Sequence, residues 1–65
     1  MSSREMVLGY VREFIDANGY PPTVRQIGAA VGLSSTATVQ MHLDTLRQSG
    51  LLEGEGRTLR LVKVA

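Results

Sequence analysis

Residues 20–46 read YPPTVRQIGAAVGLSSTATVQMHLDTL, and this stretch decides the fold of the chain. Thr23 follows two prolines and precedes Gln26 by three residues, which is the pattern of a capping box at the start of a helix. Gly32 suits the end of that helix, and the serines after it can cap a second helix. Two helices joined in this way predict a helix-turn-helix, a unit whose second helix can enter the major groove of DNA.

The first helix of this unit is predicted to bury one side and to lie close to another helix. Its expected inner face comprises Val24, Ile27, Ala30 and Val31. Gly28 and Ala29 are small, which suits a helix that a second helix crosses closely. After the stop at Gly32, we expect the side chain of Leu33 to enter the core.

The second helix of the unit is predicted to span residues 35–49, with Ser34 or Ser35 as its cap and Gly50 as its stop. The apolar side chains that fall in one narrow arc, and so predict its buried stripe, are Val39, Leu43 and Leu46. The side chains predicted on or beside the opposite arc are Ala37, Thr38, Gln40, Met41, Asp44 and Gln48.

A supporting helix is predicted before this unit, from about Ser3 to Ala17. Ser2 and Glu5 fit a capping box at its start, and Asn18-Gly19 provides a stop. Its apolar stripe comprises Val7, Leu8, Val11, Phe14 and Ile15. Gly9 lies in the helix interior at a cost of about 1 kcal/mol relative to Ala, and we expect close packing by a neighbouring helix to explain it.

Two strands are predicted after the helices, at residues 51–53 and at Thr58 to Val64, with a turn at residues 54–57. The predicted order is therefore αααββ, a mainly α winged helix-turn-helix in which a three-helix core carries a small β-hairpin, or wing. With 65 residues, the chain is long enough for one domain, which we expect to span 1–65.

Composition sets wider limits on function and location. The chain has no cysteine, which excludes a disulfide framework and favours a reducing compartment. The net charge of +1 gives only weak support for binding nucleic acid. No apolar run approaches the roughly 20 residues of a membrane span, and residues 1–11 lack an export signal. We therefore expect a cytoplasmic protein with no membrane partner.

The segment from Ser35 to Met41 carries no charge and offers hydroxyl groups, one amide and small methyl groups. Such side chains can bond to base edges or touch thymine methyl groups in the major groove. Met41 on an exposed arc fits contact with a base edge or with a partner. The alternative interpretation is that a Ser/Thr-rich helix start serves only as a cap.

Contacts to the DNA backbone are predicted at helix starts and on the wing. Helix N-termini present free N–H groups to phosphate, and Thr23, Ser34 and Thr36 lie at or beside such ends. The basic candidates are Arg25 in a first helical turn, Arg57 at the wing tip and Arg60 on a wing strand. For each of these, an ordinary solvated arginine is the alternative, and Glu53 and Glu55 partly offset the charge of the wing.

No constellation of catalytic or metal-binding residues is visible. His42 has no His, Cys or carboxylate at metal-ligand spacing on its face, and it fits a half-buried position beside the core stripe. Asp44 lies two residues away, a spacing at which helical side chains do not face each other, so the two do not form part of a triad. We therefore expect no enzyme, no cofactor, no metal and no small-molecule substrate.

These residues resemble the N-terminal DNA-binding domain of the LexA-type SOS-response repressors. The resemblance is carried by GYPPTVRQIG at 19–28, VGLSS at 31–35, Val39, His42-Leu43, Leu46 and GLL at 50–52. It implies that the helix after the turn reads a palindromic operator in double-stranded DNA, with Arg25 and the wing near the backbone. The residues that it implies as base-facing are Ser35, Ala37, Thr38, Gln40 and Met41. The peptidase half of that family lies outside these residues, so self-cleavage is not carried over.

Two hypotheses of function follow. The first is a sequence-specific transcription regulator, most simply a repressor by occlusion, with homodimerisation on DNA as a variant. The second is a winged-helix module that binds a protein and modulates another DNA-bound factor. The chain is either a stand-alone regulator or an excised domain, and the lack of an obvious linker after the wing favours the former.

Overall fold

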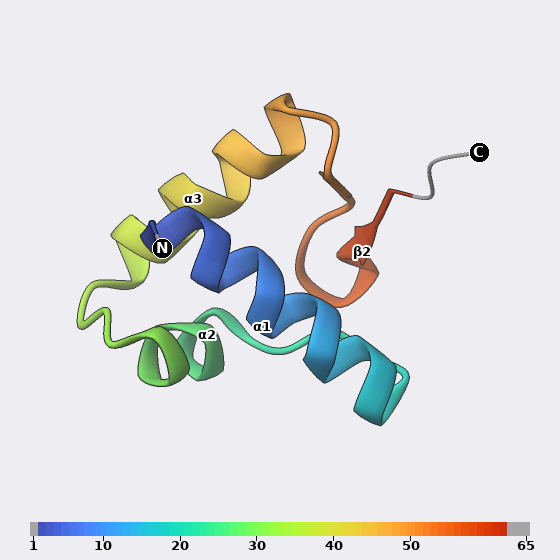
Figure 1. Ribbon diagram of the computed structural model, residues 1–65, viewed down its shortest axis with the longest axis horizontal. Coiled ribbons are helices and arrows are strands. Elements are labelled where there is room, and N and C mark those ends of the chain that lie inside the picture. The colour runs from blue at the N-terminus through green and yellow to red at the C-terminus, as the bar shows by residue number, and fades with distance from the viewer. Residues whose placement is uncertain (1, 63–65) are drawn as a thin grey trace.

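The computed structural model describes residues 2–62, and in this range three helices precede a two-stranded antiparallel hairpin (Figure 1). The elements are α1 (Ser3–Asn18), α2 (Val24–Val31), α3 (Thr36–Gln48), β1 (Leu52–Glu53), the 3-10 turn η1 (Gly56–Thr58) and β2 (Arg60–Leu61). Each helix packs against the other two, and β1 packs against α3. The predicted αααββ order and the mainly α winged helix-turn-helix are confirmed.

Helix α1 begins at the predicted capping box and ends one residue later than predicted. The Ser2 hydroxyl accepts from the Glu5 N–H at 3.2 Å, and the Glu5 carboxylate accepts from the Ser2 N–H at 3.4 Å. Gly19 closes the helix in the left-handed conformation at φ +78°. The explanation offered for Gly9 is wrong, because a Cβ atom there would have no atom of another helix within 4 Å.

Helix α2 has the predicted capping box and the predicted glycine stop. The Thr23 hydroxyl accepts from the Gln26 N–H at 3.1 Å, and the Gln26 side chain accepts from the Thr23 N–H at 2.8 Å. At Gly28 the close approach is confirmed, because a Cβ atom would lie 2.9 Å from the Leu33 carbonyl oxygen and 3.4 Å from Cγ2 of Val39. The turn after α2 therefore lies so close to Gly28 that any larger residue there would force neighbouring atoms to move.

The predicted inner face of α2 is wrong at Ala30, which is exposed, as is Ala29. At about 100° per residue, Ile27, Gly28 and Val31 share one arc, and Ala30 points about 110° away from its centre. The short helix therefore buries a narrower and differently centred side than the run of apolar residues suggested.

Helix α3 is capped by Ser35, which decides between the two candidate serines. The Ser35 hydroxyl accepts from the Thr38 N–H at 3.4 Å. At the other end, Gly50 at φ +77° lets its own N–H donate to the Arg47 carbonyl, and the Leu51 N–H donates to the Leu46 carbonyl, both at 3.0 Å. This pair of bonds is a Schellman motif, which turns the chain sharply into the wing.

The wing is shorter than predicted. Leu52 pairs with Leu61 and Glu53 with Arg60, so the first strand begins one residue late. The second strand does not begin at Thr58, because the hydroxyl of Thr58 donates to the Glu55 carbonyl at 2.8 Å and accepts from the Glu55 N–H at 3.0 Å, which holds it in η1. The end of the predicted strand, residues 63–64, lies outside the described residues.

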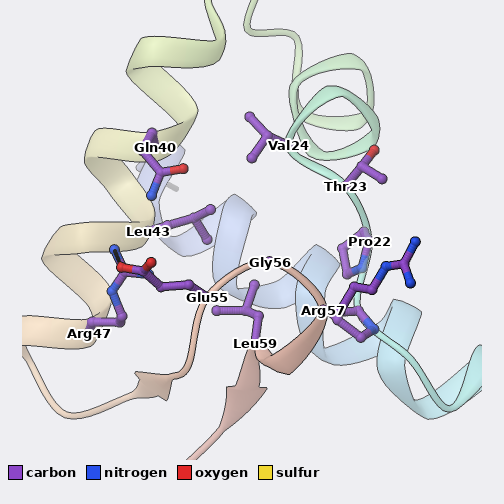
Figure 2. Close-up of a pocket in the computed structure, with 11 residues that line it drawn as sticks. Pro22, Thr23, Val24, Gln40, Leu43, Arg47, Glu55, Gly56, Arg57 and Leu59 are labelled. Atoms are coloured by element: carbon purple, nitrogen blue, oxygen red, sulfur yellow. Dashed lines mark ion pairs between the residues drawn. The ribbon is translucent and has the colours of Figure 1, made fainter.

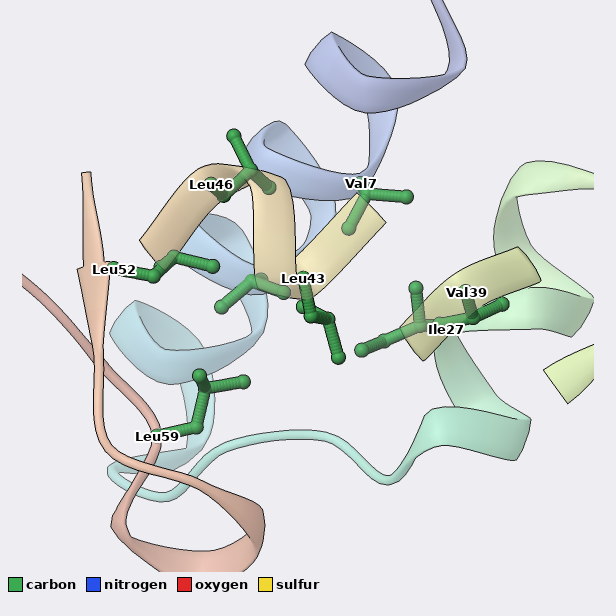
Figure 3. Close-up of a cluster of buried hydrophobic side chains, with 8 residues drawn as sticks. Val7, Ile27, Val39, Leu43, Leu46, Leu52 and Leu59 are labelled. Atoms are coloured by element: carbon green, nitrogen blue, oxygen red, sulfur yellow. The ribbon is translucent and has the colours of Figure 1, made fainter. Parts of the chain in front are cut away.

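A single apolar cluster joins the helices to the wing (Figure 3). Its members, each no more than 5% exposed, are Val7, Val11, Ile27, Val39, Leu43, Leu46, Leu52 and Leu59. The predicted α3 stripe is therefore confirmed. Leu33 was expected to enter the core, but it is only half-buried and packs against the margin of the cluster. Because Leu52 and Leu59 share this core, the wing is held at a set place beside α3.

Gly9 and Gly28 make a matched pair for testing the close approach at the turn. We expect Gly9→Ala to raise the free energy of unfolding by roughly 0.5–1 kcal/mol, because alanine has the better helix propensity and open space surrounds the site. Gly28→Ala should instead lower it by about 1–3 kcal/mol, as overpacking does. Urea unfolding followed by circular dichroism measures both, and equal stabilisation by the two changes would show that the Leu33 turn does not restrict Gly28.

Candidate nucleic-acid interface

The outward side of the first half of α3 carries the residues predicted to face bases. Ser35, Ala37 and Gln40 are exposed, Met41 is 55% exposed, and Thr38 is half-buried. The first turn of the helix contains no acidic side chain. This side lies opposite the buried stripe, so it presents hydroxyl, amide and methyl groups without a repulsive charge near its tip.

Gln40 makes a side-chain contact that sequence reasoning missed. Its Nε2 donates to Oδ1 of Asp44 at 3.3 Å, one helical turn further along α3. The spacing of four residues was a signal for this bond, since such side chains are neighbours on a helix. The bond orients the Gln40 amide while leaving its carbonyl oxygen and one N–H free.

The candidates for backbone contact at the helix starts are all on the surface. Thr23 is exposed and its hydroxyl, which accepts from Gln26, can still donate to another group. Arg25 is exposed in the first turn of α2, a turn without an acidic side chain, and makes no ion pair among residues 2–62. Ser34 and Thr36 are exposed on either side of the α3 cap.

The two wing arginines differ in their partners. Arg60 Nε lies 2.6 Å from Oε1 of Glu53 on the paired strand, so its charge is already balanced. Arg57 is exposed and, within the described part of the chain, has no ion-pair partner. Of the two wing arginines, Arg57 is therefore the more available to an external anion.

A cleft of about 420 Å³ lies between the start of α2, the middle of α3 and the wing tip (Figure 2). It is lined by Thr23 at the cap of α2, Gln40 from α3 and Arg57 from the wing. Apolar side chains, which include Val24, Leu43 and Leu59, also line it. The fold thus brings candidates from three separate elements to the edges of one concave surface.

Arg47 is the second feature that sequence reasoning missed. Its Nη1 donates to the Gly54 carbonyl at 3.1 Å, and its Nη2 bonds Asp44 and lies 3.6 Å from Oε1 of Glu55. The spacing to Asp44 was visible in the sequence, but the contacts with the wing depend on where the hairpin folds back.

His42 is half-buried beside the core stripe, as expected.

Residues 2–62 contain no group of three or more His, Cys, Asp or Glu side chains arranged to hold a metal ion. None of their helices combines the length and the apolar character that a membrane-crossing segment needs.

Comparison with known proteins agrees with this geometry. The family model described as the LexA DNA binding domain matches residues 2–60. The LexA repressor of Pediococcus pentosaceus is 50% identical over 58 residues, a match covering 89% of this chain and 28% of that protein. The LexA repressor of an Exiguobacterium species is 42% identical over 65 residues, covering 98% and 32%. The LexA repressor of Oenococcus oeni is 47% identical over 58 residues, covering 89% and 27%.

The chain thus spans about three-tenths of the length of the curated relatives that it matches. The family model nevertheless covers nearly all of it, including the three helices and the first residue of β2. On this match, the chain belongs to the LexA DNA-binding domain family.

Proposed function

We propose that this protein binds double-stranded DNA in a sequence-specific manner and represses transcription by occluding an operator. The observation that carries this proposal is the outward side of the first half of α3. It has no acidic side chain in its first turn and lines one cleft with Thr23 and Arg57 in a chain of this family. Binding to DNA fits a bacterial or phage-encoded protein in the cytoplasm. We treat residues 1–65 as one DNA-binding unit and assign it no catalytic role.

In this proposal the first half of α3 lies in the major groove. The Gln40 amide can bond the N6 and N7 edge of adenine, and the methyl groups of Ala37 and Thr38 can contact thymine. Ser35 and Met41 border these residues on the exposed side of the helix. The family match favours this function over a protein-binding module.

Phosphate contacts would come from the borders of the same surface. We assign these contacts to residues at the helix starts and to the wing arginines. The residues at the helix starts are Thr23, Arg25, Ser34 and Thr36. Arg57 has an open side chain, whereas a phosphate at Arg60 must compete with the Glu53 carboxylate.

One such domain would hold DNA weakly. A single recognition module buries roughly 600–1,000 Å² on DNA, at the low end of specific complexes. We therefore propose that two copies occupy the half-sites of a palindromic operator. The longer relatives are named repressors, and this arrangement would let the domain act in the same way.

Gln40→Ala tests the base-reading role of α3. We expect the variant to lose discrimination at one base-pair position, by about 1–3 kcal/mol, because the amide that bonds the base edge is removed. Selection of bound sequences from a random duplex pool measures this loss. Gln48→Ala is the matched control, since Gln48 is exposed on the same helix but beyond the proposed contact. If Gln40→Ala selects the same bases as the wild-type protein, Gln40 does not read a base.

Arg57→Gln tests the contact between the wing and a DNA phosphate through the salt dependence of DNA binding. Each phosphate contact contributes about 0.9 to the slope of log affinity against log salt concentration. We expect Arg57→Gln to reduce that slope by about this amount and to weaken binding to all sequences alike. Arg12→Gln makes the same charge change on the exposed side of α1. If both variants reduce the slope equally, the effect reflects net charge and the wing contact is absent.

A further inference from the structure

One carboxylate oxygen of α3 receives bonds from two directions. Oδ1 of Asp44 accepts from Nε2 of Gln40 at 3.3 Å and also from Nη2 of Arg47. These residues are separated by steps of four and three along the helix, so they form a row on one side of it. The row runs from the half of α3 proposed to read bases towards the half that faces the wing.

The same arginine continues this row into the wing. Arg47 Nη1 donates to the carbonyl of Gly54 at 3.1 Å, and Nη2 lies 3.6 Å from the Glu55 carboxylate. Figure 2 shows the Arg47 and Glu55 side chains meeting at the lower edge of the cleft. Gly54 and Glu55 begin the turn that leads to Arg57, so the bonds act where the wing tip is positioned.

The setting of these bonds differs from that of an ordinary surface ion pair. The Arg47 side chain is only 21% exposed, whereas the side chains of its partners Asp44 and Glu55 are 50% and 80% exposed. The distinguishing bond of Arg47 goes to a backbone carbonyl, which cannot move away alone. Exposed pairs such as Arg60–Glu53 contribute little because both side chains are free to separate. The planar fork of an arginine can bond two partners at once, which a lysine ammonium does with less geometric control.

We propose that Asp44 and Arg47 are positioning residues for DNA recognition. Asp44 orients the Gln40 amide, and Arg47 links that carboxylate to the wing at Gly54 and Glu55, so that base reading and wing placement depend on each other. Arg47 also offsets part of the negative charge of two carboxylates, Asp44 and Glu55, that repel DNA near the cleft. This inference rests on the proposed function, since it assigns roles in the same surface.

The link can be tested first in the free protein by NMR. We expect Arg47→Lys, which keeps the charge, to shift the Glu55 backbone amide signal, because that N–H shares a peptide group with the Gly54 carbonyl. It should also shift the side-chain amide signals of Gln40. Asp44→Asn should shift the Gln40 side-chain signals as well. Asp16→Asn, the same change on the exposed side of α1, serves as the control. If Arg47→Lys leaves the NMR signals of Gln40 and of the wing turn unchanged, the proposed link is overturned.

A double-mutant cycle on DNA then tests whether the link matters for recognition. Its variants are Gln40→Ala, Arg47→Lys and the two combined, with a duplex selected by the wild-type protein. We expect the double variant to bind about fivefold more tightly than the product of the two single losses predicts, because contacting residues of one network are not additive. Asp44→Asn should relax the same base position as Gln40→Ala.

The outcomes separate this inference from the function on which it rests. If the wild-type protein selects no sequence, the proposed function fails and the positioning roles fail with it. If it selects a sequence but the cycle is additive and Asp44→Asn keeps every base preference, only the positioning roles are overturned. Circular dichroism of each variant shows whether a loss comes from unfolding.

Discussion

The buried stripe of α3 is the constraint on which the rest of this structure depends. Val39, Leu43 and Leu46 fix one side of the helix in a core shared by all three helices and the wing. A helix held by one side must present its other side outward, and here that side begins with uncharged side chains. Burial on one side of α3 therefore determines which groups are available for recognition on the other.

The small size of the domain makes local bonds important to this arrangement. Two complete capping boxes start α1 and α2, a serine cap starts α3, and glycines in the left-handed conformation follow each helix. Gly28 adds a tertiary requirement, because the Leu33 carbonyl lies where a side chain would begin. Together these features set the distance and angle between α2 and α3, so that Thr23 and Gln40 line one cleft.

Sequence reasoning predicted the helices well because their signals are local. Capping residues, glycine stops and the period of the α3 stripe all act within a few positions, and the structure confirms them. It failed where a tertiary or competing interaction decided the result. Ala30 faces solvent because the buried side of a short helix is set by its neighbours, and Thr58 stays in a turn because its hydroxyl bonds Glu55. The contacts of Arg47 with the wing depend on where the hairpin lies, which no spacing in the sequence records.

The central claim is that the outward side of α3, together with the wing tip, forms the DNA-binding surface. The most direct measurement is NMR titration of the protein with a duplex chosen by selection, followed at each backbone amide. The account predicts the largest shifts at residues 35–41 and near Arg57, with little change on the exposed side of α1. Shifts centred on the exposed side of α1 around Arg12 and Asp16, with residues 35–41 unaffected, would contradict it.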